Sequence, residues 1–200
     1  MRRDLLADIS ASLVSSFHDQ RLITQGWSLA PPEYHTGIWR WIEVNYRCNT
    51  LLWDEEDKAR RMDVPNSEIA ASKHRIDTYN QKRNDAVERL DEEILERLSG
   101  VARLPGARLS SETPGSMIDR LSILSLKVFH MRLQIERRDV HEDHIKSCIA
   151  KLNRLVEQRM DLQNCLDFLL TQAARGYAYF KVYRQFKMYN DPSLNPYLYL

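Results

Sequence analysis

Apolar residues recur at intervals of three and four along most of this 200-residue chain, which is the spacing of one face of an α-helix. The pattern predicts helices at residues 4–24, 34–62, 66–99, 114–137 and 140–175, and a shorter one at 178–189. Every proline lies between these segments, at the start of one, or after the last, where helices begin and end. Strand signals are absent, so the fold is predicted to be all-α.

The predicted helices are long, and their length limits how they can pack. Thirty residues of α-helix extend about 45 Å at 1.5 Å per residue, which favours antiparallel packing side by side over a cluster of short helices. We therefore expect one domain over residues 1–200, a long-helix antiparallel bundle of about five helices. Residues 176–200 would form a short helical arm at the C-terminus.

Composition narrows the choice of partners. Lys plus Arg number 29 against 28 Asp plus Glu, so the formal charge is +1 and no overall field attracts nucleic acid. We expect no nucleic-acid partner. The absence of a run of 18 apolar residues predicts no membrane span, and the N-terminus lacks a secretory signal. Three cysteines without a C-x-x-C pair favour free thiols, a cytoplasmic location and no metal site.

Amides and charges interrupt the apolar stripes near the middle of the predicted helices. Buried and unpaired, each such group costs about 1–3 kcal/mol, so the groups need partners. They could form a buried network that fixes helix register, a ligand site inside the bundle, or a subunit interface. The candidate positions are Asn45, Asn49, Glu56, Arg60, Lys73, Asp77, Asn80, Arg83, Asn84, Asp119, Arg120 and Lys127.

A second candidate site precedes the predicted helix at 114–137. Ser111, Thr113 and Ser116 lie around Pro114 and Gly115, where hydroxyls, free backbone N–H groups and the helix dipole could hold a phosphate. The same residue types are ordinary helix caps, with proline at the first helical position. Both interpretations can hold together.

Three other patterns allow chemistry, and each has a simpler interpretation. Glu88 and Asp91 fit half of a magnesium-binding signature, but solvated or ion-paired helix faces are the simpler explanation. His141 and His144 have a metal-ligand spacing at an exposed first turn. His130 shares a side with Asp119 and Lys127, so it is either a proton carrier or a hydrogen-bonded core histidine.

The C-terminal segment interleaves aromatic and basic residues. The side chains of such a segment can stack on nucleobases or sugars or bind at a membrane surface. The segment can also pack across the bundle. The residues are Tyr177, Tyr179, Phe180, Lys181, Tyr183, Arg184, Phe186, Lys187, Tyr189, Tyr197 and Tyr199.

Three phrases carry a resemblance to a known family: Leu52-Trp53 through Glu56 to Arg60, Ile76-Asp77 through Asn80 to Asp85, and Ser111 to Ser116 continuing to Lys127. With these phrases, which span about residues 38–131, the chain resembles the bacterial all-helical family called domain of unknown function 4254. The resemblance implies a helical bacterial protein, some of whose relatives are encoded beside glycosyltransferase-type genes for surface polysaccharide. Family members often carry His after the tryptophan, where this chain has Asp54. The resemblance implies no activity.

Together these patterns predict a polar site inside the bundle that binds a small phosphate-bearing ligand, a nucleotide or a nucleotide-sugar. The family resemblance implies a link to cell-envelope polysaccharide synthesis. Arginines and Lys127 would pair with phosphate oxygens, and asparagines would bind hydroxyls or a base edge. In a catalytic site, Glu56 and Asp77 would serve as acid and base or hold metal, and Arg120 would stabilise charge. The alternatives are a scaffold that binds a partner enzyme or itself, and a magnesium-dependent nucleotide hydrolase. Enzyme status and cofactor stay open.

Overall fold

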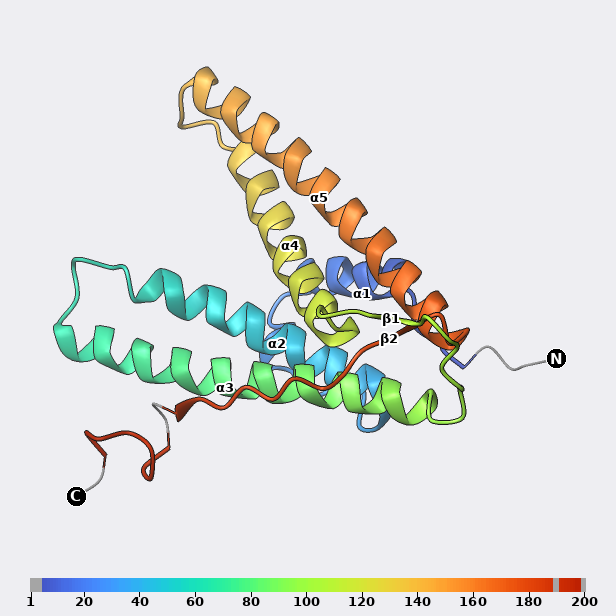
Figure 1. The fold of residues 1–200 in the computed structure, drawn as a ribbon. Helices are drawn as coiled ribbons and strands as arrows, with labels where there is room; N and C mark the ends of the chain where they lie inside the picture. Colours follow the sequence, from blue (N-terminus) through green and yellow to red (C-terminus); the bar gives the residue numbers. More distant parts are fainter. Residues whose placement is uncertain (1–4, 189–190, 199–200) are drawn as a thin grey trace.

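The computed structural model describes residues 5–188 and 191–198, and helices dominate it (Figure 1). The long helices are α1 (Ala11–Leu22), α2 (Gly37–Lys58), α3 (Asn66–Arg97), α4 (Pro114–Ile135) and α5 (Glu142–Ala174). A short 3-10 helix, η1 (Trp27–Leu29), follows α1. The predicted all-α bundle of about five helices is confirmed.

Two helical hairpins make up the bundle. α2 packs along α3, and α4 packs along α5, while α1 lies against α4 and α5. The hairpins meet at one end and diverge toward their turns, at residues 59–65 and 136–141 (Figure 1). Their tips therefore extend beyond the region where all the helices are in contact.

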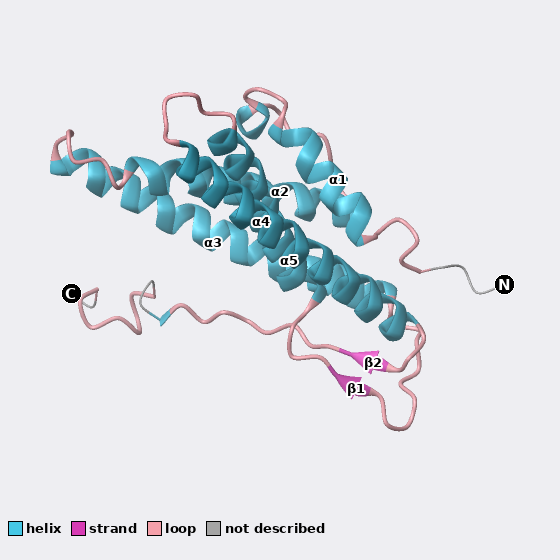
Figure 2. Cartoon of the chain, turned by 90° about the horizontal axis from the view of Figure 1, so that it is seen from above, coloured by secondary structure: helices cyan, strands magenta, loops and turns pink. Residues whose placement is uncertain are grey.

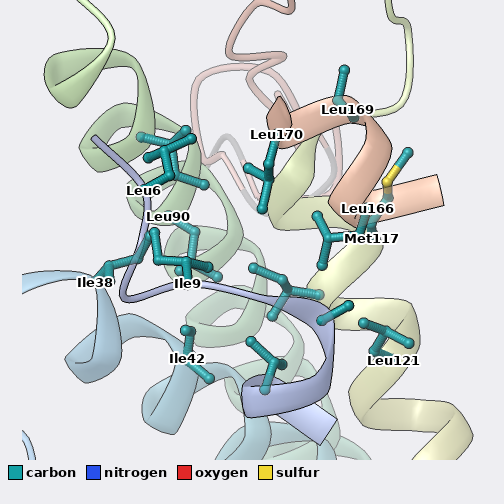
Figure 3. Packing of buried hydrophobic residues seen from close by; sticks show 14 of the residues in the cluster. Leu6, Ile9, Ile38, Ile42, Leu90, Met117, Leu121, Leu166, Leu169 and Leu170 are labelled. Carbon is teal, nitrogen blue, oxygen red and sulfur yellow. The ribbon is translucent and has the colours of Figure 1, made fainter. Parts of the chain in front are cut away.

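The hydrophobic core lies where the five helices meet (Figure 3). Ile42, Leu90, Ile118 and Leu166, from α2 to α5 in order, are wholly enclosed, as is Val14 of α1. Burying one such aliphatic side chain contributes about 1.5–3 kcal/mol. The core therefore holds the two hairpins together where they meet. Interactions other than this core stabilise the outer halves of the hairpins.

The first helix begins later than its apolar pattern predicted. The hydroxyl of Ser10 accepts a hydrogen bond from the backbone N–H of Leu13 at 3.2 Å, so Ser10 caps a helix that starts at Ala11. Leu6 and Ile9 precede the cap and are buried without being helical. The predicted range 4–24 is thus too long, and its residue 4 lies outside the described part of the chain.

The predicted helix at 178–189 is wrong, and so is the expectation of no strand. Gly176 has φ +80°, and the chain then forms β2 (Ala178–Tyr179), parallel to β1 (Arg108–Leu109) (Figure 2). Beyond β2 the arm runs extended beside α3, where Arg184 forms ion pairs with Glu88 and Glu92. The aromatic residues Tyr189 and Tyr199 of the predicted arm lie outside the described residues.

Candidate functional site

Amides from α2 and a carboxylate from α4 form a hydrogen-bonded cluster beside the core. Asp119 Oδ1 accepts hydrogen bonds from Asn45 Nδ2 and from Asn49 Nδ2, each at 2.8 Å. Asn49 Nδ2 also donates to Ser122 Oγ at 2.5 Å. Arg83 comes from α3, with its Nε 3.9 Å from Asp119 Oδ1. The structure thus brings Asn45, Asn49, Arg83 and Asp119 together.

This cluster retains unused hydrogen-bonding capacity. Asn45 Oδ1 and Arg83 Nε are buried and have no hydrogen-bond partner among the described residues. A second guanidinium nitrogen of Arg83 donates to Asn84 Oδ1 at 3.3 Å. Burial and the nearby Arg83 lower the pKa of Lys187, which places the C-terminal arm close to the cluster. One buried donor and one buried acceptor of the cluster are therefore left without a hydrogen bond.

Other predicted positions lie apart from the cluster, and the expectation that they face inward is corrected. Near the tip of the α2–α3 hairpin, Glu56 accepts from Arg60 at 2.8 Å and lies 3.8 Å from Lys73. Arg60 and Lys73 are largely exposed. Asp77 is exposed, and Asn80 is half-buried. The two hairpins diverge toward this tip (Figure 1).

The predicted phosphate cradle at the start of α4 is filled by the chain itself. Thr113 and Ser116 form a reciprocal capping box, as the simpler interpretation expected. The carboxylate of Asp91 in α3 accepts from the backbone N–H of Gly115 at 2.7 Å. Arg120 points outward and pairs with Glu112, both at the surface. Ser111 is exposed.

A cleft of about 580 Å³ opens between α2, α4 and α5, beyond the core. Three cations line it, Lys127 of α4 and Lys151 and Arg154 of α5, with Asp57 of α2 as the lining carboxylate. None of the three cations forms an ion pair with a described residue. With His130 neutral, the three cations and the carboxylate of Asp57 give the residues that line the cleft a net charge of +2. Such an excess without counter-ions suits an anionic ligand.

Two aromatic rings form one wall of the cleft. Trp53 stacks on His130 with their ring centroids 4.4 Å apart and their planes 5° from parallel. Burial lowers the pKa of His130, while the nearby Asp57 and Asp54 oppose that shift. Trp53 follows Asn49 by one helical turn, so the polar cluster and the cleft lie along one seam between α2 and α4.

A family model described as "Protein of unknown function (DUF4254)" matches residues 39–182, which is well over half of the chain. The chain belongs to the DUF4254 family. Every cleft residue lies inside the DUF4254 match, whereas α1 precedes it. No curated protein and no solved structure matches the chain.

Several residues that shape this DUF4254 chain escaped the sequence analysis. Lys151 and Arg154 are three apart on α5, and their polar helix face resembles any solvated one, so only the structure reveals the cleft. Glu43 and Arg47 pair at 2.6 Å and tie the loop after η1 to α2. His18 is wholly buried in α1. The signals near the cleft were Lys127, His130 and the phrase Leu52-Trp53 in the family resemblance.

Within residues 5–188 and 191–198, no three His, Cys, Asp or Glu side chains are grouped so as to hold a metal ion. His141 caps α5 by accepting from the backbone N–H of Asp143 at 3.3 Å, and His144 lies 3.4 Å from the Cys148 sulfur. None of the described helices combines the length and the apolar character that crossing a membrane requires.

Proposed function

We propose that this protein binds a small phosphate-bearing ligand in the cleft between α2, α4 and α5. The observation that carries the proposal is the set of three cations, Lys127, Lys151 and Arg154, which line one cleft without ion-pair partners among the described residues. A guanidinium can hold two phosphate oxygens at once, and the two ammonium groups can neutralise a diphosphate. Lys127 was among the ligand-binding positions predicted from the sequence.

The aromatic wall extends the proposal to a nucleotide or a nucleotide-sugar. A flat base can stack on the Trp53–His130 pair, and stacking contributes about 1–3 kcal/mol per base. A volume of about 580 Å³ lies within the range of small-ligand sites. The Asn45–Asn49–Asp119 cluster would hold α2 against α4 behind this wall, and the remaining predicted positions would have no contact with the ligand.

The biological setting of the proposal comes from the family resemblance and from the cysteines. A nucleotide-sugar would suit a bacterial protein encoded near the genes for surface polysaccharide. Cys48, Cys148 and Cys165 are free thiols, which a reducing cytoplasm would preserve.

A thermal-shift titration tests the proposal. We expect nucleoside diphosphates or uridine diphosphate sugars to raise the melting temperature, because a ligand that binds only the folded state stabilises it. Arg154→Ala and Lys151→Ala should abolish the shift. Arg132→Ala removes an exposed arginine of α4 that does not line the cleft, and it should leave the shift unchanged. Equal shifts in all three variants would contradict the cleft as the site.

A scaffold role is a second candidate, favoured by the exposed aromatic residues of the arm. Phe186 is 84% and Tyr197 92% exposed. Removal of residues 181–200 keeps the buried Phe180 and should release a partner enzyme without changing the ligand shift. Nucleotide hydrolysis with magnesium gains no support from geometry, because Glu88 pairs with Arg184 and Asp91 caps α4.

A further inference from the structure

One face of α5 is covered along its C-terminal half and uncovered along its N-terminal half. Helix α1 covers this face along the C-terminal half of α5. Asp167 accepts from the backbone N–H of Ala11 at 2.7 Å, and Gln163 donates to Ser15 at 2.7 Å. The last contact of this series is the Arg159–Asp19 ion pair at 2.5 Å. Because α1 ends at Leu22, the same face continues toward residue 142 without a neighbouring helix from the described part of the chain.

The uncovered part of this face is apolar. Its residues follow the helical spacing of three and four that leads on to Arg159 and Gln163. Ile149 is 43%, Val156 37% and Met160 56% exposed. Ile145 and Leu152 are half-buried. We call these five residues, Ile145, Ile149, Leu152, Val156 and Met160, the α5 stripe.

We propose that a second copy of this chain packs antiparallel on the α5 stripe, so that the protein forms a two-fold symmetric dimer. Across a two-fold axis contacts are reciprocal: if a residue contacts a second residue of the other copy, that second residue contacts the first in return. The stripe has the spacing that this requires. With an axis between residues 152 and 153, Ile145 faces Met160 of the second copy and Ile149 faces Val156. The same two contacts are repeated on the other side of the axis, with the roles of the two copies reversed.

Charges beside the stripe are complementary under the same symmetry. Lys146 and Glu157 lie on one flank of the stripe, eleven residues apart. In an antiparallel pair of helices, matching flanks face each other, so each Lys146 approaches Glu157 of the other copy within about one turn. Lys146 now pairs with the exposed Glu142 at 3.1 Å, an exchangeable contact. Asn153, an exposed amide at the axis, would fix the register.

The dimer would leave the proposed ligand site open. Lys151 and Arg154 line the cleft on a different face of α5 from Ile149 and Val156, about half a helical turn away. Loss of self-association and loss of ligand binding can therefore be measured separately in the same variants.

Sedimentation velocity of the full chain tests the proposal. At about 100 µM, a dimer with a dissociation constant near 10 µM would leave most chains paired. Ile149→Asp with Val156→Asp should give a monomer that keeps its helical circular dichroism and its ligand-induced thermal shift. Leu13→Asp places the same charge at a similarly exposed leucine of α1, 48% exposed, and should leave the dimer intact. A wild-type monomer, or a dimer unaffected by the paired change, would overturn the proposal.

A charge exchange tests the antiparallel register. Lys146→Glu alone and Glu157→Lys alone should each weaken the dimer about tenfold, because each creates two like-charge contacts across the axis. The double variant restores opposite charges and should return the dissociation constant to within about twofold of wild type. A double variant no better than the single ones would exclude this register. Binding of the wild type to anionic lipid vesicles, abolished by the same stripe changes in a chain that stays monomeric, would instead assign the stripe to a membrane surface.

Discussion

The carboxylate of Asp91 accepts a hydrogen bond from the backbone N–H of Gly115, with Oδ1 2.7 Å from the nitrogen. Gly115 is the second residue of α4, and Thr113 also bonds to this carboxylate. A helix N-terminus favours a negative charge, which was the reason for predicting a phosphate there. A side chain of α3 supplies that charge, so the contact joins the two hairpins.

Asp91→Asn should change how stability depends on pH. Burial raises the pKa of Asp91 to about 6 from its usual 3.8, although Thr113 and Gly115 oppose the shift. Between pH 3.8 and about pH 6, the carboxyl group of Asp91 therefore keeps a proton in the folded chain that it has released in the unfolded chain. This group's contribution to the unfolding free energy falls by about 3 kcal/mol as the pH rises from about 4 to about 6, and then stays constant.

The amide cannot titrate, so urea denaturation of the Asp91→Asn variant should lack this slope. Glu93→Gln removes a half-buried carboxylate two residues further along α3 and serves as the control. Identical pH profiles for wild type and Asp91→Asn would contradict the buried proton.

Gly115→Ala should push α4 away from α3. A Cβ at this position would lie 2.6 Å from the backbone oxygen of Val87 and 2.9 Å from Asp91 Oδ1, closer than such atoms can approach. We expect a loss of about 3 kcal/mol in the free energy of unfolding, measured in urea. Gly100→Ala is the matched control, since a Cβ there meets nothing within 4 Å, and its cost should be under about 0.5 kcal/mol.

Arg47→Ala should destabilise the loop that follows η1. Arg47 donates to the backbone oxygens of Trp27 and Ala30 at 2.8 and 2.7 Å, and to Glu43, which is 2% exposed. Without the guanidinium, Glu43 would be a buried carboxylate lacking its counter-ion, at a cost of about 3 kcal/mol. Chemical denaturation measures the loss, and Arg40→Ala, at an exposed position of the same helix, should change stability little. Equal effects at both positions would refute this role for the ion pair.

His18→Leu should protect the protein from acid. The imidazole of His18 is fully buried, 4.2 Å from the Tyr46 ring, and neither ring nitrogen has a partner among the described residues. Burial lowers its pKa to about 3, so below the usual 6.5 only the unfolded chain takes up the proton. Stability is thus lost as the pH falls, by up to about 5 kcal/mol near pH 3. His74→Leu, at an exposed histidine, should keep the acid sensitivity in pH-dependent melting curves.

Periodicity predicted the long helices because each one has an apolar face over most of its length. It also predicted that Asn45, Asn49 and Asp119 would meet, since they interrupt stripes at the point where α2 and α4 are in contact. Periodicity identifies a face, but it does not give the length over which another helix covers that face. Glu56 and Ile149 continue their stripes, yet Glu56 is only half-buried and Ile149 is 43% exposed.

The C-terminal arm shows a second limit of the sequence. Residues 178–179 form β2 because Arg108 and Leu109 lie beside them, after a reversal at Gly176 where a Cβ would come 2.3 Å from the Ala102 carbonyl oxygen. The local spacing of apolar residues gives no information about such a distant strand partner. The cleft could not be predicted for the same reason. Lys151 and Arg154 form a cleft only because the fold places them opposite Lys127 and Trp53.

Ligand binding in the cleft should strengthen as the pH falls through the range of His130. Burial lowers the pKa of this imidazole in the free protein, and a bound phosphate would favour its charged form and raise the pKa again. Binding would therefore take up a proton, and the affinity for a nucleoside diphosphate should rise as the pH falls. Calorimetry in two buffers with different ionisation heats measures the proton directly. His130→Phe keeps a ring beside Trp53 but cannot titrate, so its affinity should vary less with pH. An unchanged slope would place the titrating group elsewhere.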